Sequence, residues 1–367
     1  MDRLAAAAGA SRKRRRVCVG STDVYEEVSG LGSGNFGAVV KARHRVTGQT
    51  VAIKRLTLSD ADGGLAEDPL QEAALHEACA GHPSIVGFHG VVRDPSTSRI
   101  CLVMECVDGP SLHDYLHHHR LRPRRRGAPS LLPEATVRAA MWQLLGAAKK
   151  MHESRVIHRD IKPENILVAG DHRSVKICDF GLAMSMSDAP PYEQAGTLEY
   201  KAPEMLLEIP DYGAAVDAWS LGCVMAEIIA GGTPLFEKGG GGDDGQLVAI
   251  FDLLGMPVDE TWPGFSSTPF ATKVVPELKV NRRNRLREIF PKATLSEEGF
   301  EVLDGLLTCN PGKRLTAEDA LKKPWFDKVD ALELPRKDEV ASALPSWKKK
   351  LLVSPAAAGK RRKLQCV

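Results

Sequence analysis

The stretch His158-Arg-Asp-Ile-Lys-Pro-Glu-Asn165, followed at a short distance by Asp179-Phe-Gly181, decides how this sequence is interpreted. Phosphoryl transfer needs a carboxylate near the acceptor hydroxyl and metal ligands that help to neutralise the transferred charge. Asp160 suits the first role. Asn165 and Asp179 suit the second, because Mg²⁺ prefers hard oxygen ligands. The stretch therefore predicts nucleotide-driven phosphotransfer.

A glycine-rich stretch lies upstream and reads Gly32-Ser33-Gly34-Asn35-Phe36-Gly37-Ala38-Val39. The G-x-G-x-x-G spacing also occurs in dinucleotide-binding folds, where a helix follows the glycines directly. Here Val39-Val40 continues as a predicted strand, which favours a hairpin over phosphates, because glycine lets backbone amides approach an anion. An ordinary glycine-rich hairpin is the alternative.

The next motif, Val51-Ala-Ile-Lys54, ends a buried apolar strand with a lysine. Burying that cation is costly unless it meets an anion, which ATP phosphates and a helix carboxylate would supply. Glu72, in a helix predicted over Pro69–Ala80, is the candidate carboxylate. Glu67 and Glu77 are alternatives, and so is a Glu72 that is merely solvated.

The pattern of secondary structure changes along the chain. Short apolar runs separated by turns predict strands from Val28 to about Val107. After Gly109 the pattern is helical, and Pro133 begins a long amphipathic stretch. A small β-rich part followed by a large helical part predicts an α+β fold of two lobes. Further helices are predicted over 216–229, 246–254 and 317–321, and irregular segments over 117–130 and 238–245.

The charge of the 367-residue chain is unevenly distributed, although 49 basic and 47 acidic residues nearly cancel. Residues 1–20 contain six basic and one acidic side chain, and residues 346–367 contain seven basic and none acidic, which leaves 36 basic against 46 acidic between them. The basic runs Arg12–Arg16 and Lys360–Lys363 predict nuclear import, with solvated charge as the alternative. Nucleic-acid binding is not favoured, because no aromatic residues interleave with these runs.

Composition excludes several other classes. A hydrophobic fraction of 43% with 26% charged residues is typical of globular proteins. No uncharged apolar run approaches the roughly 18 residues that cross a bilayer. Eight scattered cysteines without a C-x-x-C pair predict reduced thiols in an intracellular compartment. The predicted division is a basic arm over 1–24, a catalytic domain over 25–326 with lobes of 25–107 and 108–326, and a basic tail over 327–367.

Together these motifs resemble the protein kinase family over residues 25–326, and Lys162 in the catalytic loop is similar to the serine/threonine type. Three further stretches support the resemblance. Asp217-Ala-Trp-Ser-Leu-Gly-Cys223 is similar to the segment that anchors the catalytic loop, and 246–264 is similar to the insert of cyclin-dependent kinases. Asn310-Pro-Gly-Lys-Arg314 resembles the segment whose arginine pairs with the glutamate of Ala202-Pro-Glu204, so a structural ion pair between Arg314 and Glu204 is implied.

The resemblance also implies a bilobal kinase fold, ATP and Mg²⁺ as cofactors, a protein substrate and individual site roles. The residues implied for catalysis are Asp160, Lys162, Lys54 and Glu72, with Asn165 and Asp179 as metal ligands. Met104 would be the gatekeeper, and Thr197 would position the acceptor. The residues implied for ATP binding are Leu31, Gly32, Ser33, Gly34, Asn35, Phe36, Gly37, Ala38, Val39, Ala52, Lys54, Glu105, Val107 and Leu167.

Positions that regulate activity depart from the family's pattern. Asn35-Phe36 cannot accept phosphate where cyclin-dependent kinases often have Thr-Tyr, and Tyr192 occupies the place of the activating threonine. Of the three arginines that would hold a phosphate there, only Arg159 remains, since Gln71 and Met184 occupy the other two places. We therefore predict activity that does not depend on the usual threonine phosphorylation.

Other departures concern partners and substrates. Segment 67–72 is a poor match to the family's cyclin-contacting signature, so a cyclin-like activator is a candidate partner only. Lys201 stands where proline-directed relatives have arginine and lacks its bidentate fork, so proline direction is a weak preference. His76 replaces an apolar residue, and a packed neutral histidine is favoured over a pH switch. A kinase-shaped scaffold without turnover is the rival function, and the complete set of motif residues argues against it.

Overall fold

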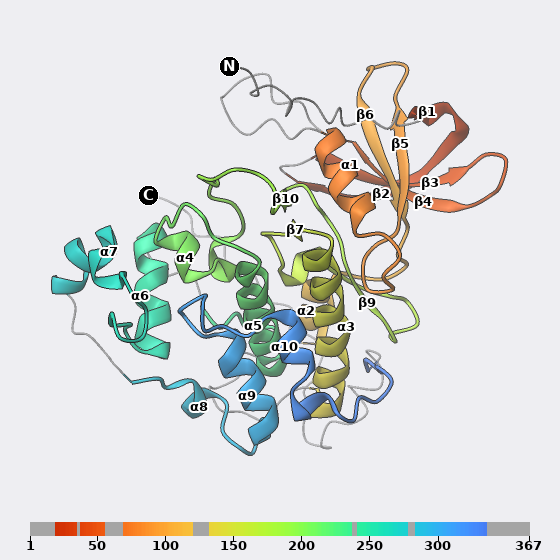
Figure 1. The fold of residues 1–367 in the computed structure, drawn as a ribbon. Coiled ribbons are helices and arrows are strands. Elements are labelled where there is room, and N and C mark those ends of the chain that lie inside the picture. Colours follow the sequence, from red (N-terminus) through yellow and green to blue (C-terminus); the bar gives the residue numbers. More distant parts are fainter. Residues whose placement is uncertain are drawn as a thin grey trace, which may run out of the picture.

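A six-stranded sheet forms the N-terminal lobe (Figure 1). The structure is a computed structural model that describes residues 19–34, 37–55, 69–119, 132–236, 241–277 and 283–335. The strands of the sheet are β1 (Val19–Ser21), β2 (Tyr25–Gly34), β3 (Gly37–His44), β4 (Thr50–Arg55), β5 (Phe88–Arg93) and β6 (Ile100–Glu105). Their order is β1-β5-β6-β4-β3-β2, and every neighbouring pair is antiparallel except β1 and β5.

Burial along β3 and β4 explains why these segments are strands. Alternate residues of β3, Val40 and Ala42, are buried, as the two-residue period of a strand requires. They join Val51 and Ile53 of β4 in one apolar cluster. Lys54 follows on the same buried strand, and β4 thereby brings a cation into the interior.

Helix α1 (Pro69–Ala78) packs against β5 and β6. Its buried side chains recur at helical spacing and include Glu72, Ala73, Leu75 and His76. The helix was predicted over Pro69–Ala80 and ends two residues earlier, where a turn begins.

The C-terminal lobe is helical (Figure 1). Its helices are α2 (Leu112–His119), α3 (Glu134–Glu153), α4 (Pro203–Leu206), α5 (Ala215–Ala230), α6 (Gly242–Leu254), α7 (Pro269–Lys273), α8 (Leu286–Ile289), α9 (Glu297–Leu306) and α10 (Ala317–Leu321). Helices α3 and α5 pack together at its centre. The apolar positions predicted for α3 are all buried, namely Val137, Met141, Leu144, Leu145 and Ala148.

Two small sheets, each of two strands, flank the loops that contain the predicted catalytic and metal-binding residues. Strands β7 (Val156–Ile157) and β10 (Met184–Ser185) form one pair, and β8 (Ile166–Val168) and β9 (Val175–Ile177) form the other. The loop between β7 and β8 contains Asp160 and Asn165. The loop between β9 and β10 contains Asp179, so the two pairs hold both loops at one place.

The α+β fold of two lobes is therefore confirmed, and ordered structure extends beyond residues 25–326 at both ends. Residues 19–24, predicted as part of an arm, form β1 and a 3-10 turn. At the other end, Leu332 and Leu334 of the predicted tail are buried in the core of the C-terminal lobe. Tyr115 of α2 also donates a hydrogen bond to the carbonyl of Pro335.

Two predicted irregular segments were partly wrong. Residues 117–119 belong to α2, whose Leu112, Tyr115 and Leu116 are buried at helical spacing. Residues 242–245 form the first turn of α6, where Asp243 and Asp244 favour a helix N-terminus. The predicted arm over 1–18, the loop over 120–130 and the tail beyond 335 lie outside the described residues. Among the helices that the structure describes, none combines the length and apolar character of a membrane span.

Candidate active site

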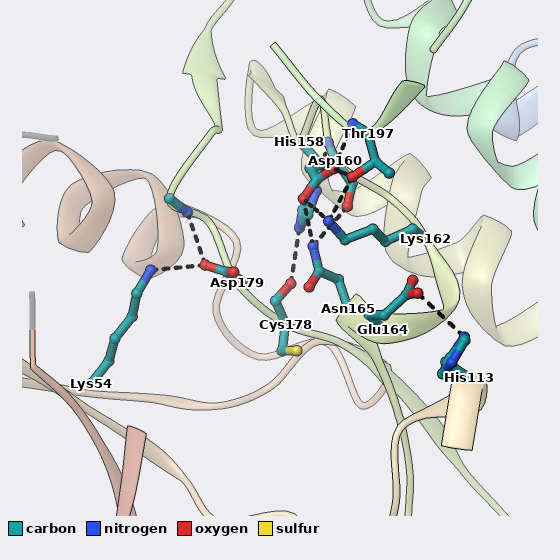
Figure 2. Close-up of polar contacts among 11 residues, drawn as sticks. Lys54, His113, His158, Asp160, Lys162, Glu164, Asn165, Cys178, Asp179 and Thr197 are labelled. Atoms are coloured by element: carbon teal, nitrogen blue, oxygen red, sulfur yellow. Dashed lines mark hydrogen bonds and ion pairs between the residues drawn. The ribbon is translucent and has the colours of Figure 1, made fainter. Parts of the chain in front are cut away.

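Asp160 lies in the loop between β7 and β8, and four hydrogen-bond donors hold its carboxylate (Figure 2). Its Oδ1 accepts from the backbone N–H of Thr197 at 3.0 Å and from the Thr197 hydroxyl at 2.8 Å. Its Oδ2 accepts from Asn165 Nδ2 at 2.9 Å and lies 2.9 Å from Lys162 Nζ. Lys162 Nζ also donates to Thr197 Oγ1 at 2.6 Å. The structure thus brings these four predicted site residues into one cluster.

The loop that carries Asp160 is anchored from α5. Asp217, which is fully buried, accepts the backbone N–H groups of His158 and Arg159, each at 2.9 Å. His152 Nε2 lies 2.9 Å from the same carboxylate. Burial would raise the pKa of Asp217, but the hydrogen bonds from His152 and from the His158 backbone keep it below its usual range. This anchor holds Arg159 at a φ of 68°, a strained backbone conformation next to Asp160.

Lys54 joins the two lobes through a buried charge cluster. Its Nζ donates to Glu72 Oε1 at 2.9 Å and to Asp179 Oδ1 at 2.8 Å. Burial alone would lower the pKa of Lys54, but the Asp179 and Glu72 carboxylates outweigh it and raise that pKa. Of the alternatives to Glu72 weighed on the sequence, Glu77 is exposed and Glu67 lies outside the described residues.

The two carboxylates of this cluster differ in their titration. Burial raises the pKa of Glu72, and Lys54 offsets part of that rise. Burial also disfavours the charged form of Asp179, yet Lys54 and the Gly181 backbone N–H keep the pKa of Asp179 below its ordinary range. Asp179 is therefore a carboxylate at neutral pH. Its backbone has a φ of 66°, and its side chain points towards Lys54 (Figure 2).

The predicted metal ligands, Asn165 and Asp179, offer hard oxygen atoms on either side of the site. Asn165 Nδ2 donates to the backbone and the carboxylate of Asp160, each at 2.9 Å, which leaves its carbonyl oxygen for a cation. Asp179 uses Oδ1 for Lys54 and Gly181, which leaves Oδ2. Two protein oxygen ligands suit Mg²⁺, which usually keeps several waters and binds substrate phosphates as well.

The residues predicted to bind the nucleotide line the sheet and the connection between the lobes. Gly32 pairs with Val39, so the glycine-rich stretch enters a strand hairpin and no helix follows it. Ala52 is buried on β4 opposite Met104 on β6. Leu31, Ser33 and Gly34 belong to β2, Gly37 and Ala38 to β3, Glu105 ends β6, Val107 follows it, and Leu167 lies on β8. Asn35 and Phe36 lie outside the described residues.

Sequence reasoning named Glu105 for ATP binding but missed the ion pair of its side chain. The carboxylate accepts from the Gly87 backbone N–H at 2.9 Å and from Lys176 Nζ at 2.9 Å. Lys176 lies on β9, three residues before Asp179, so this ion pair ties the end of β6 to the loop that carries Asp179. The only sequence signal is a lysine at the centre of the short apolar run Val175–Ile177.

Two predictions about structural side chains are confirmed. Arg314 Nη1 and Nη2 donate to the Glu204 carboxylate at 2.6 and 2.7 Å, and both residues are buried. His76 is fully buried, stacks on Phe180 with ring centroids 4.5 Å apart and contacts the Val86 carbonyl through Nε2 at 2.6 Å. Burial lowers the pKa of His76 to about 4, so it is a packed neutral histidine.

Comparison with known proteins matches residues 25–326 to the protein kinase domain. A putative cyclin-dependent kinase F-2 of Oryza sativa subsp. japonica is 44% identical over 315 residues, which are 83% of this chain and 90% of the relative. Cell division control protein 2 homolog 3 of Trypanosoma brucei brucei is 37% identical, over 83% of this chain and 92% of the relative. Cyclin-dependent kinase G-1 of Oryza sativa subsp. indica is 36% identical over 89% of this chain, which spans 45% of that longer relative.

Proposed function

Since this chain belongs to the protein kinase family, we propose that it transfers the γ-phosphate of Mg²⁺-ATP to hydroxyl groups positioned at Asp160. It is an ATP-dependent serine/threonine kinase that resembles cyclin-dependent kinases, and its substrates are proteins. The observation that carries the proposal is the geometry around Asp160 and Lys54. Two clusters from different parts of the chain, each built around a lysine and carboxylate contact, lie at one site (Figure 2).

Asp160 orients the acceptor hydroxyl and accepts its proton. Four donors fix the carboxylate, so its orientation is set by the fold. Lys162 contacts both Asp160 and Thr197, which places its positive charge beside the acceptor, where charge on the transferred group is neutralised. Thr197 holds the substrate-binding side of this cluster through its backbone and its hydroxyl.

Lys54, Glu72 and Asp179 hold the nucleotide side of the site. The buried Glu72 carboxylate orients the Lys54 ammonium, which then presents its charge to nucleotide phosphates. Asn165 and Asp179 would hold Mg²⁺. When bound, the metal would neutralise phosphate charge, which is the chemistry that these side chains cannot supply alone.

The experiment that tests this function measures transfer of labelled γ-phosphate to a generic basic protein by the purified full chain. Asp160→Asn removes the group that accepts the proton, and Asp179→Asn removes a carboxylate that would hold Mg²⁺. Each should lower the rate by about a hundred-fold or more. Asp330→Asn, at an exposed residue outside the site, is the matched control and should keep the wild-type rate. Equal incorporation by the wild type and both site variants would refute the catalytic assignment and favour a scaffold.

We also propose that the protein acts in the nucleus. The support is the pair of basic runs, Arg12–Arg16 and Lys360–Lys363, at opposite ends of a chain whose body is acidic. A fluorescent fusion in which both runs are changed to alanine should lose nuclear accumulation that the wild-type fusion shows. Unchanged nuclear accumulation of the double variant would contradict this proposal and would leave the proposed kinase function unaffected.

We propose a cyclin-like subunit as the regulatory partner to test first. The support is the similarity to relatives that are named cyclin-dependent kinases, together with Leu70, an apolar residue that is 43% exposed on α1. Affinity purification of the tagged chain from its own cells, followed by mass spectrometry, should recover a cyclin-like protein. Leu70→Glu should reduce that recovery, and full activity of the chain purified without any partner would argue against dependence on it.

A further inference from the structure

Arg159, which directly precedes Asp160, directs its side chain at the segment that carries Thr197. Its Nε donates to the Leu182 carbonyl at 2.6 Å, and its Nη1 donates to the Tyr212 hydroxyl at 3.0 Å and the Glu193 carbonyl at 3.4 Å. All three acceptors are neutral. Among the described residues Arg159 forms no ion pair with a carboxylate, so neutral oxygens hold this guanidinium.

Tyr212 is the centre of these contacts. Its side chain is only 4% exposed, in the connection between α4 and α5. The hydroxyl accepts from Arg159 and donates to the Glu193 carbonyl at 2.6 Å. One buried hydroxyl therefore links the catalytic loop to residue 193 of the segment between β10 and α4, which we call the activation segment (residues 186–202).

The activation segment continues from residue 193 along the backbone of the same loop. Gly196 has a φ of +93°, and a Cβ built on it would lie 2.4 Å from the Arg159 carbonyl oxygen, so the two backbones touch. The next residue, Thr197, donates its two hydrogen bonds to Asp160. Residues 193–197 are thus laid along Arg159 and Asp160, with the Tyr212 hydroxyl at one end and the Asp160 carboxylate at the other.

The neighbouring Tyr192 does not share these bonds. Its ring meets the Tyr212 ring edge to face at 5.4 Å, but its hydroxyl donates to the Asp188 carbonyl at 3.1 Å. Gln71 and Met184 bring no charge that could bind a phosphate there, since one is an exposed amide on α1 and the other a buried thioether on β10. The hydrogen bonds that hold the Arg159 side chain are therefore all made to neutral groups.

We propose that Tyr212 is a positioning residue for phosphotransfer. Its hydroxyl holds the activation segment against the catalytic loop and does there what a phosphorylated residue 192 would otherwise do. The inference rests on the proposed kinase function and adds to it that the dephosphorylated chain is already competent.

The test compares two tyrosines that lie in contact. The full chain is treated with a phosphatase active on serine, threonine and tyrosine, and intact mass confirms that no phosphate remains. Tyr212→Phe keeps the ring and removes one oxygen atom, and should lower kcat about ten-fold while leaving the KM for ATP unchanged, because a hydrogen bond to a charged group is lost. Tyr192→Phe, the matched control, should stay within about two-fold of the wild type, because its hydroxyl bonds only a neutral carbonyl.

Amide hydrogen exchange provides a readout that does not require activity. In Tyr212→Phe, amides of residues 193–197 should exchange faster, while those of the β8–β9 pair should keep wild-type protection, which also shows that the variant is folded. Wild-type kcat in dephosphorylated Tyr212→Phe together with unchanged exchange would overturn the inference. So would loss of wild-type activity on phosphatase treatment that Tyr192→Phe reproduces. A wild type without any transfer, both alone and with a recovered cyclin-like partner, would instead refute the proposed function, and the exchange data would still decide the role of Tyr212.

Discussion

Glu204 and Arg314 form an ion pair that is removed from water in the folded protein. Both are buried, and the guanidinium donates two hydrogen bonds to the carboxylate. Glu204→Ala should therefore lower the free energy of unfolding by roughly 3–5 kcal/mol, because it leaves a buried charge without its partner. Glu27→Ala, which breaks the exposed pair with Arg55, should cost less than about 1 kcal/mol. Urea unfolding of both variants checks this, and equal costs would show that burial of the first pair has no energetic consequence.

His76 makes stability depend on pH. Its pKa in the folded state is lowered to about 4 from an ordinary 6.5, so between these values the unfolded chain binds a proton that the folded chain does not. Stability from this residue is therefore complete above pH 6.5 and is lost as the pH falls towards 4, by roughly 3 kcal/mol in all. His76→Phe, which can still stack on Phe180, should show a smaller drop in unfolding free energy between pH 7 and 5 than the wild type. Parallel drops would assign the pH effect to other groups.

Individual site residues could be predicted from the sequence where their chemistry requires a particular partner. Lys54 and Glu72 could be identified, and the structure brings them together, because a buried cation demands an anion. The bonds of Glu105 to Lys176, and of Tyr212 to Arg159, could not be foreseen. They depend on which segments of the chain meet after folding, and the residue types lysine and tyrosine do not indicate such a contact.

At the scale of the element, helix interiors were predictable and helix ends were not. Buried apolar residues recur through α5, and the predicted span 216–229 differs from Ala215–Ala230 by one residue at each end. Helix α6 begins four residues before the predicted Gln246, inside a run of glycine and aspartate that is typical of loops. There the acidic first turn, with Asp243 and Asp244, favours the helix more than glycine disfavours it.

Strand β1 gives a prediction about one element. Its three residues pair with β5 in parallel, from Val19 opposite Val91 to Ser21 opposite Arg93. A chain that begins at Thr22 should be less stable than one that begins at Val19 by roughly 1–3 kcal/mol, because a few backbone hydrogen bonds are lost. Thermal and urea unfolding of the two truncations measure that difference directly. Equal stabilities would mean that β1 contributes nothing to the sheet.

At the scale of the whole molecule, ligand binding should couple the lobes. Lys54 belongs to the sheet and Asp179 to the loop after β9, so the proposed Mg²⁺-nucleotide, held by both, should stabilise only the folded arrangement. At a hundred-fold excess over Kd, the expected gain in unfolding free energy is roughly 3 kcal/mol. Chelation of the metal should remove part of this gain in the wild type, and Asp179→Asn should be insensitive to chelation. A thermal shift series with and without EDTA checks both statements.

The two-lobed architecture could also be predicted from the sequence, but the packing of the C-terminal segment could not. The change from strand to helix patterns predicted two lobes, and the motifs predicted the residues of the site. Leu332 and Leu334 could not be assigned to the core, because two alternating leucines in a polar segment give too weak a pattern. Long-range packing against the C-terminal lobe, and not local propensity, orders this segment.

Strand β1 has a further consequence for how copies of the protein behave in concentrated solution. Without it, β5 would be the outermost strand and would offer six residues of unpaired backbone to a second molecule. With β1 in place, residues 91–93 of β5 are paired and the outer strand at this edge is only three residues long, and short edge strands are poor templates for edge-to-edge aggregation. These three residues should therefore protect this edge of the sheet from pairing with a second molecule.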